Sequence, residues 1–73
     1  MTLRPLSYRR VAKRLEELKF HPVRQSGSHI IFKHTDGRMT VVPNHPGEKI
    51  GRGLLRKIIR DVDISIEEFM QKV

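Results

Sequence analysis

The sequence predicts a two-layer α+β domain, in which helices cover one face of a three-stranded antiparallel sheet. Apolar residues recur with a helical period over residues 8–18 and again over 50–62. Between these segments, two runs of β-branched and aromatic residues flank an Asp-Gly pair. The predicted order is helix, three strands, helix and a short terminal helix. A chain of 73 residues has room for one such domain, to which we assign residues 1–73.

The first helix is expected to begin after Ser7, a residue type that caps helix N-termini. Its apolar residues recur at steps of three and four, with charged residues between them: Tyr8, Val11, Ala12, Leu15 and Leu18. The helix must stop near Phe20, because Pro22 disfavours a helical conformation at the preceding residue and lacks an N–H group. We expect a short first strand over residues 23–26.

Two further strands are expected over residues 29–34 and 38–42, on either side of Asp36-Gly37, a strong hairpin signal. A two-residue turn would pair Phe32 with Val41 and His34 with Met39. In that register, the face toward the helices carries Ile30, Phe32, His34, Met39 and Val41. The opposite, open face would carry His29, Ile31, Lys33, Thr40 and Val42.

The last third of the chain predicts a loop and two helices. Pro43 is expected to end the third strand, and residues 44–47 have the composition of a loop. A wide apolar stripe of helical period then follows: Ile50, Leu54, Leu55, Ile58, Ile59 and Val62. The segment Ser65-Ile66-Glu67-Glu68 has the form of a capping box and predicts a short final helix.

Charge and composition narrow the classes of partner and chemistry. There are 15 Lys and Arg against 8 Asp and Glu, a net charge of +7, and residues 1–60 alone carry +10. Such an excess favours a polyanionic partner, nucleic acid or an anionic surface. Cys is absent, which excludes disulfides, thiolate zinc sites and a cysteine nucleophile. No apolar run approaches the ~20 residues that span a bilayer, so we expect a soluble cytoplasmic protein.

The four histidines are the plausible proton-transfer groups near neutral pH. His21 and His34 are predicted to be solvated, while His45 lies in a loop that could reach a site or merely turn the chain. His29 begins the central strand after Gly27-Ser28, and on spacing alone it is most simply a polar residue on an open sheet face. His29 and His34 would face opposite sides of a strand, so we expect no metal site and no cofactor.

Several fragments, taken in order and spacing, closely resemble the HicA family of toxins, the RNA-cleaving halves of HicA/HicB toxin–antitoxin pairs. They are Gly27-Ser28-His29, Asp36-Gly37-Arg38, Val42-Pro43-Asn44-His45-Pro46-Gly47 and Gly53-Leu54-Leu55-Arg56-Lys57-Ile58-Ile59. The resemblance runs from about Tyr8 to Phe69. It implies a fold like that of double-stranded-RNA-binding domains and ribosome-independent cleavage of mRNA, with His29 as the catalytic residue. It also implies a HicB-type antitoxin that covers this histidine.

Two departures from the family pattern bear on fine specificity. Asn44 stands where relatives often carry a basic residue or Phe before the second His, and Gly51 interrupts the start of the helix. A metal-free ribonuclease needs a group that moves protons, here His29, and cations that offset charge on the phosphate. The residues predicted to contact RNA are Arg24, Gly27, Ser28, Lys33, Lys49 and Arg52.

The predicted partner surface is an apolar pair, Ile31 and Val42, on the open face of the sheet. An apolar centre with a positive rim suits an antitoxin that has an acidic rim. Two other functions stay open at this stage. One is a non-catalytic RNA-binding module of the same fold. The other is a structural subunit whose basic face binds an acidic protein.

Overall fold

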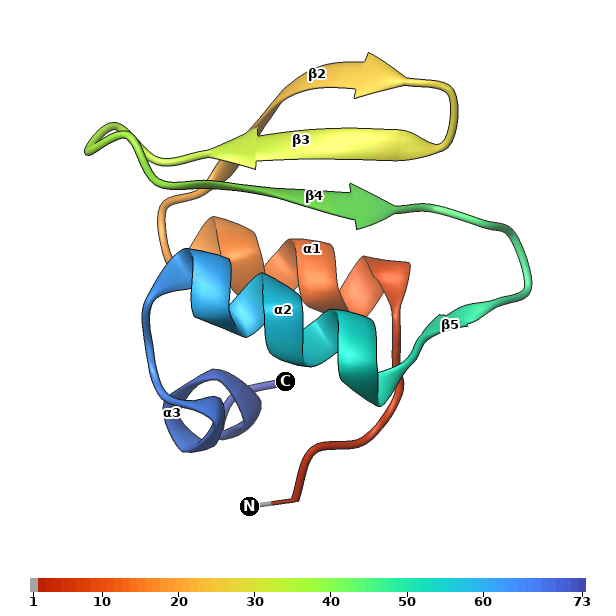
Figure 1. Ribbon diagram of the computed structural model, residues 1–73, viewed down its shortest axis with the longest axis vertical. Coiled ribbons are helices and arrows are strands. Elements are labelled where there is room, and N and C mark those ends of the chain that lie inside the picture. The colour runs from red at the N-terminus through yellow and green to blue at the C-terminus, as the bar shows by residue number, and fades with distance from the viewer. Residues whose placement is uncertain (1) are drawn as a thin grey trace.

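The computed structural model describes residues 2–73 and confirms the α+β fold. In chain order the elements are β1 (Leu6–Ser7), α1 (Tyr8–Glu17), β2 (His21–Ser26), β3 (His29–Lys33), β4 (Met39–Pro43), β5 (Lys49–Ile50), α2 (Arg52–Val62) and α3 (Ile66–Met70). Strands β2, β3 and β4 form an antiparallel sheet with β3 in the centre. Figure 1 shows α1 and α2 on one side of this sheet and α3 farther from it.

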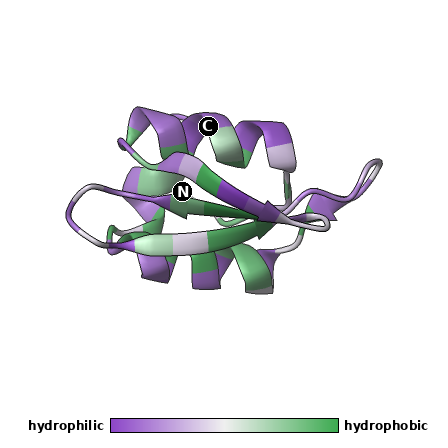
Figure 2. Ribbon diagram, turned by 90° about the horizontal axis from the view of Figure 1, so that it is seen from above, coloured by the Kyte–Doolittle hydropathy of each residue, from purple (hydrophilic) through white to green (hydrophobic). Residues whose placement is uncertain are grey.

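The hydrophobic core lies between the sheet and the helices. Its buried apolar residues are Leu3, Leu6, Val11, Leu15, Phe20, Phe32, Val42, Ile50, Leu55, Ile58, Ile59, Val62, Phe69 and Met70. Strands β3 and β4 supply the apolar side chains of the sheet, whereas β2 is largely hydrophilic (Figure 2). All six residues of β2 are exposed, as expected for an edge strand that the helices do not cover.

The first helix has the predicted cap but ends earlier than expected. The backbone N–H of Arg10 donates to Ser7 Oγ at 3.2 Å, which confirms Ser7 as N-cap. The helix ends at Glu17, and Lys19 adopts a left-handed conformation with φ 71°. Strand β2 therefore begins at His21 and not at Val23. Pro22 is tolerated within it because an edge strand need not donate every hydrogen bond to a neighbour.

The predicted register of the β3–β4 hairpin is wrong by one residue. Phe32 lies opposite Thr40 and not Val41, because three residues, 35–37, connect His34 to Arg38. The His34 N–H donates to the Arg38 carbonyl at 2.9 Å, and Gly37 has a φ of 100°. A three-residue loop that ends in a left-handed glycine is a common hairpin connection.

The shift turns every β4 side chain to the other face of the sheet. Val42 is fully buried in the core, so it is not available to the partner surface that the sequence predicts. Val41 takes its place opposite Ile31 on the open face, and both are half-buried. Thr40 points inward and is 2 % exposed, but its hydroxyl donates to Asp61 Oδ2 at 2.9 Å. Met39, predicted to be in the core, is 51 % exposed.

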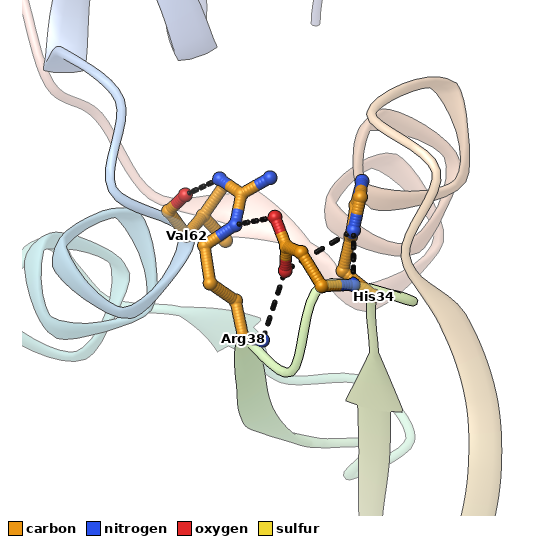
Figure 3. A network of polar contacts seen from close by, with 4 residues as sticks. His34, Arg38 and Val62 are labelled. Atoms are coloured by element: carbon orange, nitrogen blue, oxygen red, sulfur yellow. Dashed lines mark hydrogen bonds and ion pairs between the residues drawn. The ribbon is translucent and has the colours of Figure 1, made fainter.

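A polar network fastens the β3–β4 loop to the end of α2 (Figure 3). Arg38 donates through Nε to Asp36 Oδ2 at 2.9 Å and through Nη1 to the Val62 carbonyl. The Arg38 backbone N–H also donates to Asp36 Oδ1 at 3.0 Å. These contacts with Arg38 hold the pKa of Asp36 below its usual range. His34, predicted to be solvated, is instead partly buried with its ring centre 5.2 Å from that of Phe20.

Arg14 links α1 to α3 and is 5 % exposed, although the basic face of α1 predicts a solvated side chain. Its Nε donates to the Phe69 carbonyl at 2.9 Å and its Nη2 to the Glu68 carbonyl at 3.0 Å. Both acceptors are carbonyls of the last turn of α3, which lack partners within the helix. Helix α3 begins as predicted, with the Glu68 N–H donating to Ser65 Oγ at 3.0 Å.

The second long helix begins at Arg52, and not at Ile50 as the apolar stripe predicts. Ile50 belongs to β5, which pairs with β1 in a register that places Leu6 opposite Ile50. This two-stranded ladder brings Leu6 and Ser7 beside the segment that leads into α2. Across residues 2–73, no helix has the length and apolar composition that crossing a membrane requires.

Candidate functional site

The candidate site begins at a tight turn between β2 and β3. Ser26 lies opposite His29, so Gly27 and Ser28 alone make the connection. Gly27 has a φ of 59°, a conformation that favours glycine at the first position of such turns. The Gln25 side chain donates to the Gly27 carbonyl at 3.0 Å and ties the turn to β2. His29 is thereby held as the first residue of the central strand, with its side chain exposed.

The end of β4 brings a second histidine to the same place. Because β3 and β4 are antiparallel and His29 lies opposite Pro43, the residues after Pro43 return to the level of the β2–β3 turn. The Asn44 N–H donates to the Ser28 carbonyl at 2.7 Å. The rings of His29 and His45 then lie with their centres 6.3 Å apart and their planes at 85°.

Ser28 contacts the second histidine directly. Its Oγ lies 3.5 Å from His45 Nε2, at the long limit of a hydrogen bond. A hydroxyl both donates and accepts, so this contact persists whether Nε2 carries a proton or not. Ser28, which the sequence predicts to contact RNA, therefore lies in the β2–β3 turn and beside His45.

A small hollow of about 250 Å³ opens beside the two imidazoles. Its lining is contributed by β3, β4, the β4–β5 loop, β5 and the start of α2: His29, Pro43, His45, Glu48, Lys49, Ile50, Gly51 and Leu54. Pockets that enclose drug-sized ligands run to about 300–1,000 Å³. This hollow is smaller and is open to solvent.

The predicted cations lie at different distances from His29. Lys49 lines the hollow, and Arg52 follows its lining residue Gly51. Arg24 lies opposite Ile31, one row farther along the open face of the sheet. Lys33 is four residues from His29 on the same strand, which places it roughly 13 Å away at about 3.3 Å per residue. Lys33 therefore does not lie beside His29.

Most basic side chains are free to meet a polyanion. Among residues 2–73, the ion pairs of Lys and Arg with carboxylates involve only Arg14, Arg38 and Lys57. A larger hollow of about 600 Å³ lies along α1 and the chain end: Ser7, Arg9, Arg10, Lys13, Arg14, Lys72 and Val73. It holds no histidine or carboxylate side chain. This second surface is rich in Lys and Arg, but no side chain that lines it moves protons near neutral pH.

Two partly buried groups, Asp61 and Tyr8, have shifted pKa values. Partial burial raises the pKa of Asp61, but hydrogen bonds from Lys57 at 2.8 Å and Thr40 outweigh it and hold that pKa below its usual range. Burial raises the pKa of Tyr8, with a further contribution from Glu16. In the described part of the chain, no three His, Asp or Glu side chains gather closely enough to hold a metal ion.

Sequence reasoning left the position of His45 open, although one signal was available. In a hairpin, the residue just past the second strand lies beside the start of the first strand. Asn44 and His45 occupy that position relative to Ser28 and His29. Predicting their approach required no register, only the antiparallel pairing of the two strands.

Comparison with known proteins identifies the family. Residues 8–64 match the family described as the HicA toxin of bacterial toxin–antitoxin systems. A comparison with curated proteins gave no match. The matched segment includes α1, the whole sheet, α2 and every residue that lines the hollow beside His29. This chain therefore belongs to the HicA family, the toxins of bacterial toxin–antitoxin systems.

Proposed function

We propose that the chain is an endoribonuclease toxin, an mRNA interferase that cleaves RNA at His29 without a metal ion or the ribosome. One observation carries this proposal. The exposed imidazole of His29 lies at the mouth of a hollow that a lysine lines, on a protein with a net charge of +7. A proton-transfer group and cations that attract phosphates therefore lie close together.

The chemistry needs little more than this. RNA carries its own nucleophile, the 2′-OH, so the protein has to move protons and offset the charge that develops on the phosphate. His29 moves a proton, and Lys49 and Arg52 are the cations nearest to it along the lining of the hollow. Arg24 and Lys33 extend the positive surface along the open face, where the RNA chain continues.

The test is incubation of the purified protein with a long RNA in the presence of EDTA. We expect cleavage, with products that end in 2′,3′-cyclic phosphate and 5′-OH. RNA that stays intact would overturn the proposal, and so would cleavage that EDTA abolishes.

The His29→Ala variant separates an enzyme from a binding module of the same fold. We expect it to lose cleavage while binding RNA as tightly as the wild-type protein. His21→Ala is the matched control, because His21 is also an exposed histidine on the sheet and lies opposite Lys33, away from the hollow. If neither the wild-type protein nor His29→Ala cleaves RNA while both bind it, the chain is a binding module.

We also propose that a HicB-type antitoxin covers the open face of the sheet. Ile31 and Val41 lie opposite each other there, and Arg24 is the partner of Ile31 on the other side. Met39, which lies on the same face of β4 as Val41, is 51 % exposed and adds apolar surface. An apolar centre with a basic rim fits a partner that has an acidic rim and blocks access to His29.

A further inference from the structure

We propose that His45 is a second catalytic residue, which moves the proton at one oxygen of the scissile phosphodiester while His29 moves the proton at the other. This inference rests on the proposed ribonuclease function. It arises from the two imidazoles that face the same hollow, with ring centres 6.3 Å apart.

Cleavage through the 2′-OH requires two proton transfers. One imidazole accepts the proton of the 2′-OH, and the 2′-oxygen forms a bond to phosphorus. The bond from phosphorus to the 5′-oxygen breaks, and that oxygen takes a proton from the other imidazole, which starts the reaction protonated. The products are a 2′,3′-cyclic phosphate and a 5′-OH, and the two imidazoles have exchanged protonation states.

The geometry of the two rings is compatible with one proton transfer by each imidazole. Each catalytic nitrogen has to come within about 2.6–3.2 Å of its oxygen, and the two oxygens lie on opposite sides of one phosphorus atom. The two rings therefore have to be neighbours without occupying each other's hydrogen-bonding positions. A perpendicular pair at 6.3 Å, open to the hollow, meets that requirement.

The surroundings hold His45 in place although it lies in a loop. The bond from the Asn44 N–H to the Ser28 carbonyl fastens the loop to the β2–β3 turn. The Glu48 N–H donates to the His45 carbonyl at 3.0 Å and closes the loop on itself. Ser28 Oγ lies 3.5 Å from Nε2 of this imidazole. The charged side chains that share the hollow with both histidines are Glu48 and Lys49, one of each sign.

The first test compares His45→Ala, His29→Ala and the control His21→Ala on natural RNA. We expect each of the first two variants to lose about 10²-fold or more in rate, with unchanged RNA affinity and melting temperature. Added imidazole should restore part of the activity of His45→Ala, an effect that a merely structural role would not produce. A His45→Ala variant that keeps wild-type activity, or that imidazole does not rescue, would overturn the inference.

The second test uses an RNA whose scissile 5′-oxygen is replaced by sulfur, since a thiolate leaves without protonation. The variant that lacks the proton donor should recover on this substrate, and the variant that lacks the base should not. Recovery of one histidine variant alone supports the pair, whereas recovery of both or neither overturns it. If the wild-type protein cleaves no RNA, the ribonuclease proposal is overturned as well. If the wild-type protein and His45→Ala cleave RNA equally well and His29→Ala does not, only this inference is overturned.

Discussion

Replacing Arg14 by Met should lower the free energy of unfolding by about 3 kcal/mol. The guanidinium donates two hydrogen bonds to carbonyls of α3, at 2.9 and 3.0 Å, and hydrogen bonds that involve a charged group contribute about 1.5–3 kcal/mol each. We take the lower value for each, because removing a buried charge also recovers part of its desolvation cost. The contact with Glu17, at 3.4 Å to a side chain that is 41 % exposed, adds little.

This loss is large for so small a domain. At about 0.05–0.15 kcal/mol per residue, a domain of this length has a stability of roughly 4–11 kcal/mol. Urea unfolding followed by circular dichroism measures the change, and the amides of Phe69 and Met70 should exchange faster with solvent as α3 loosens. Lys13→Met is the matched control, because it removes the same charge from the neighbouring exposed position and should change stability by less than about 0.5 kcal/mol. Equal stability of the two variants would refute the assignment of Arg14 as the link between α1 and α3.

The remaining predictions concern the antitoxin complex, the pH dependence of stability and the salt dependence of RNA binding. Bound HicB-type antitoxin should protect His29 from diethyl pyrocarbonate, and Ile31→Asp should weaken the complex at an unchanged melting temperature; a His29 that is equally reactive in the complex would mean inhibition from a distance. The pKa of Asp61 is lower in the folded than in the unfolded state, where it is about 3.9. The ionised carboxylate therefore stabilises the fold fully above that unfolded pKa, and this stabilisation is lost as pH falls through the folded pKa. The melting temperature of Thr40→Val should thus lie below that of the wild-type protein at neutral pH and approach it in acid, and parallel curves would contradict this. For RNA, log affinity should fall with log salt by about 0.7 per phosphate contact on single strands, and Lys49→Met should flatten that slope; salt-independent affinity would contradict the basic surface.

The three helices and the strands β2, β3 and β4 follow from the sequence pattern, but the short strands β1 and β5 and the hairpin register do not. The Asp-Gly pair predicts a turn correctly, yet the number of residues in the turn depends on hydrogen bonds that no pattern reveals. Asp36 accepts from the backbone and the side chain of Arg38, and Arg38 reaches the end of α2. These contacts favour a three-residue loop, and one additional residue in the loop exchanges Val41 and Val42 between the two faces.

Arg14 shows what helical periodicity does not predict, namely the burial of one residue from the polar face of α1. Helical periodicity assigns basic residues of α1 to the polar face, and it takes no account of α3, which packs at the border of that face. The long guanidinium side chain then satisfies carbonyls from residues that lie 54 and 55 positions later in the chain. Composition gives the excess of positive charge, but it does not identify Arg14 as the arginine that is buried against α3.

The residues of the site could be predicted from the sequence to different extents. Spacing alone left His29 as an exposed residue on a sheet, and its catalytic role entered through resemblance to a family, which the match over residues 8–64 supports only at the level of a toxin. Its catalytic role stays a prediction. Alternation places Lys33 on the same face as His29, but it does not give the distance of about 13 Å that four residues of strand put between them.

The fold separates the groups that stabilise it from the groups that we propose react. The Arg38 network joins the β3–β4 loop to the end of α2, while His29 begins β3 at the opposite end of the strand. Arg14 acts on the far side of the helices, against α3. The two histidines rest on a two-residue turn and a loop whose side chains are exposed. Substitutions at His29 and His45 should therefore alter cleavage without altering the core. A loss of activity in these variants would then reflect lost catalysis and not unfolding.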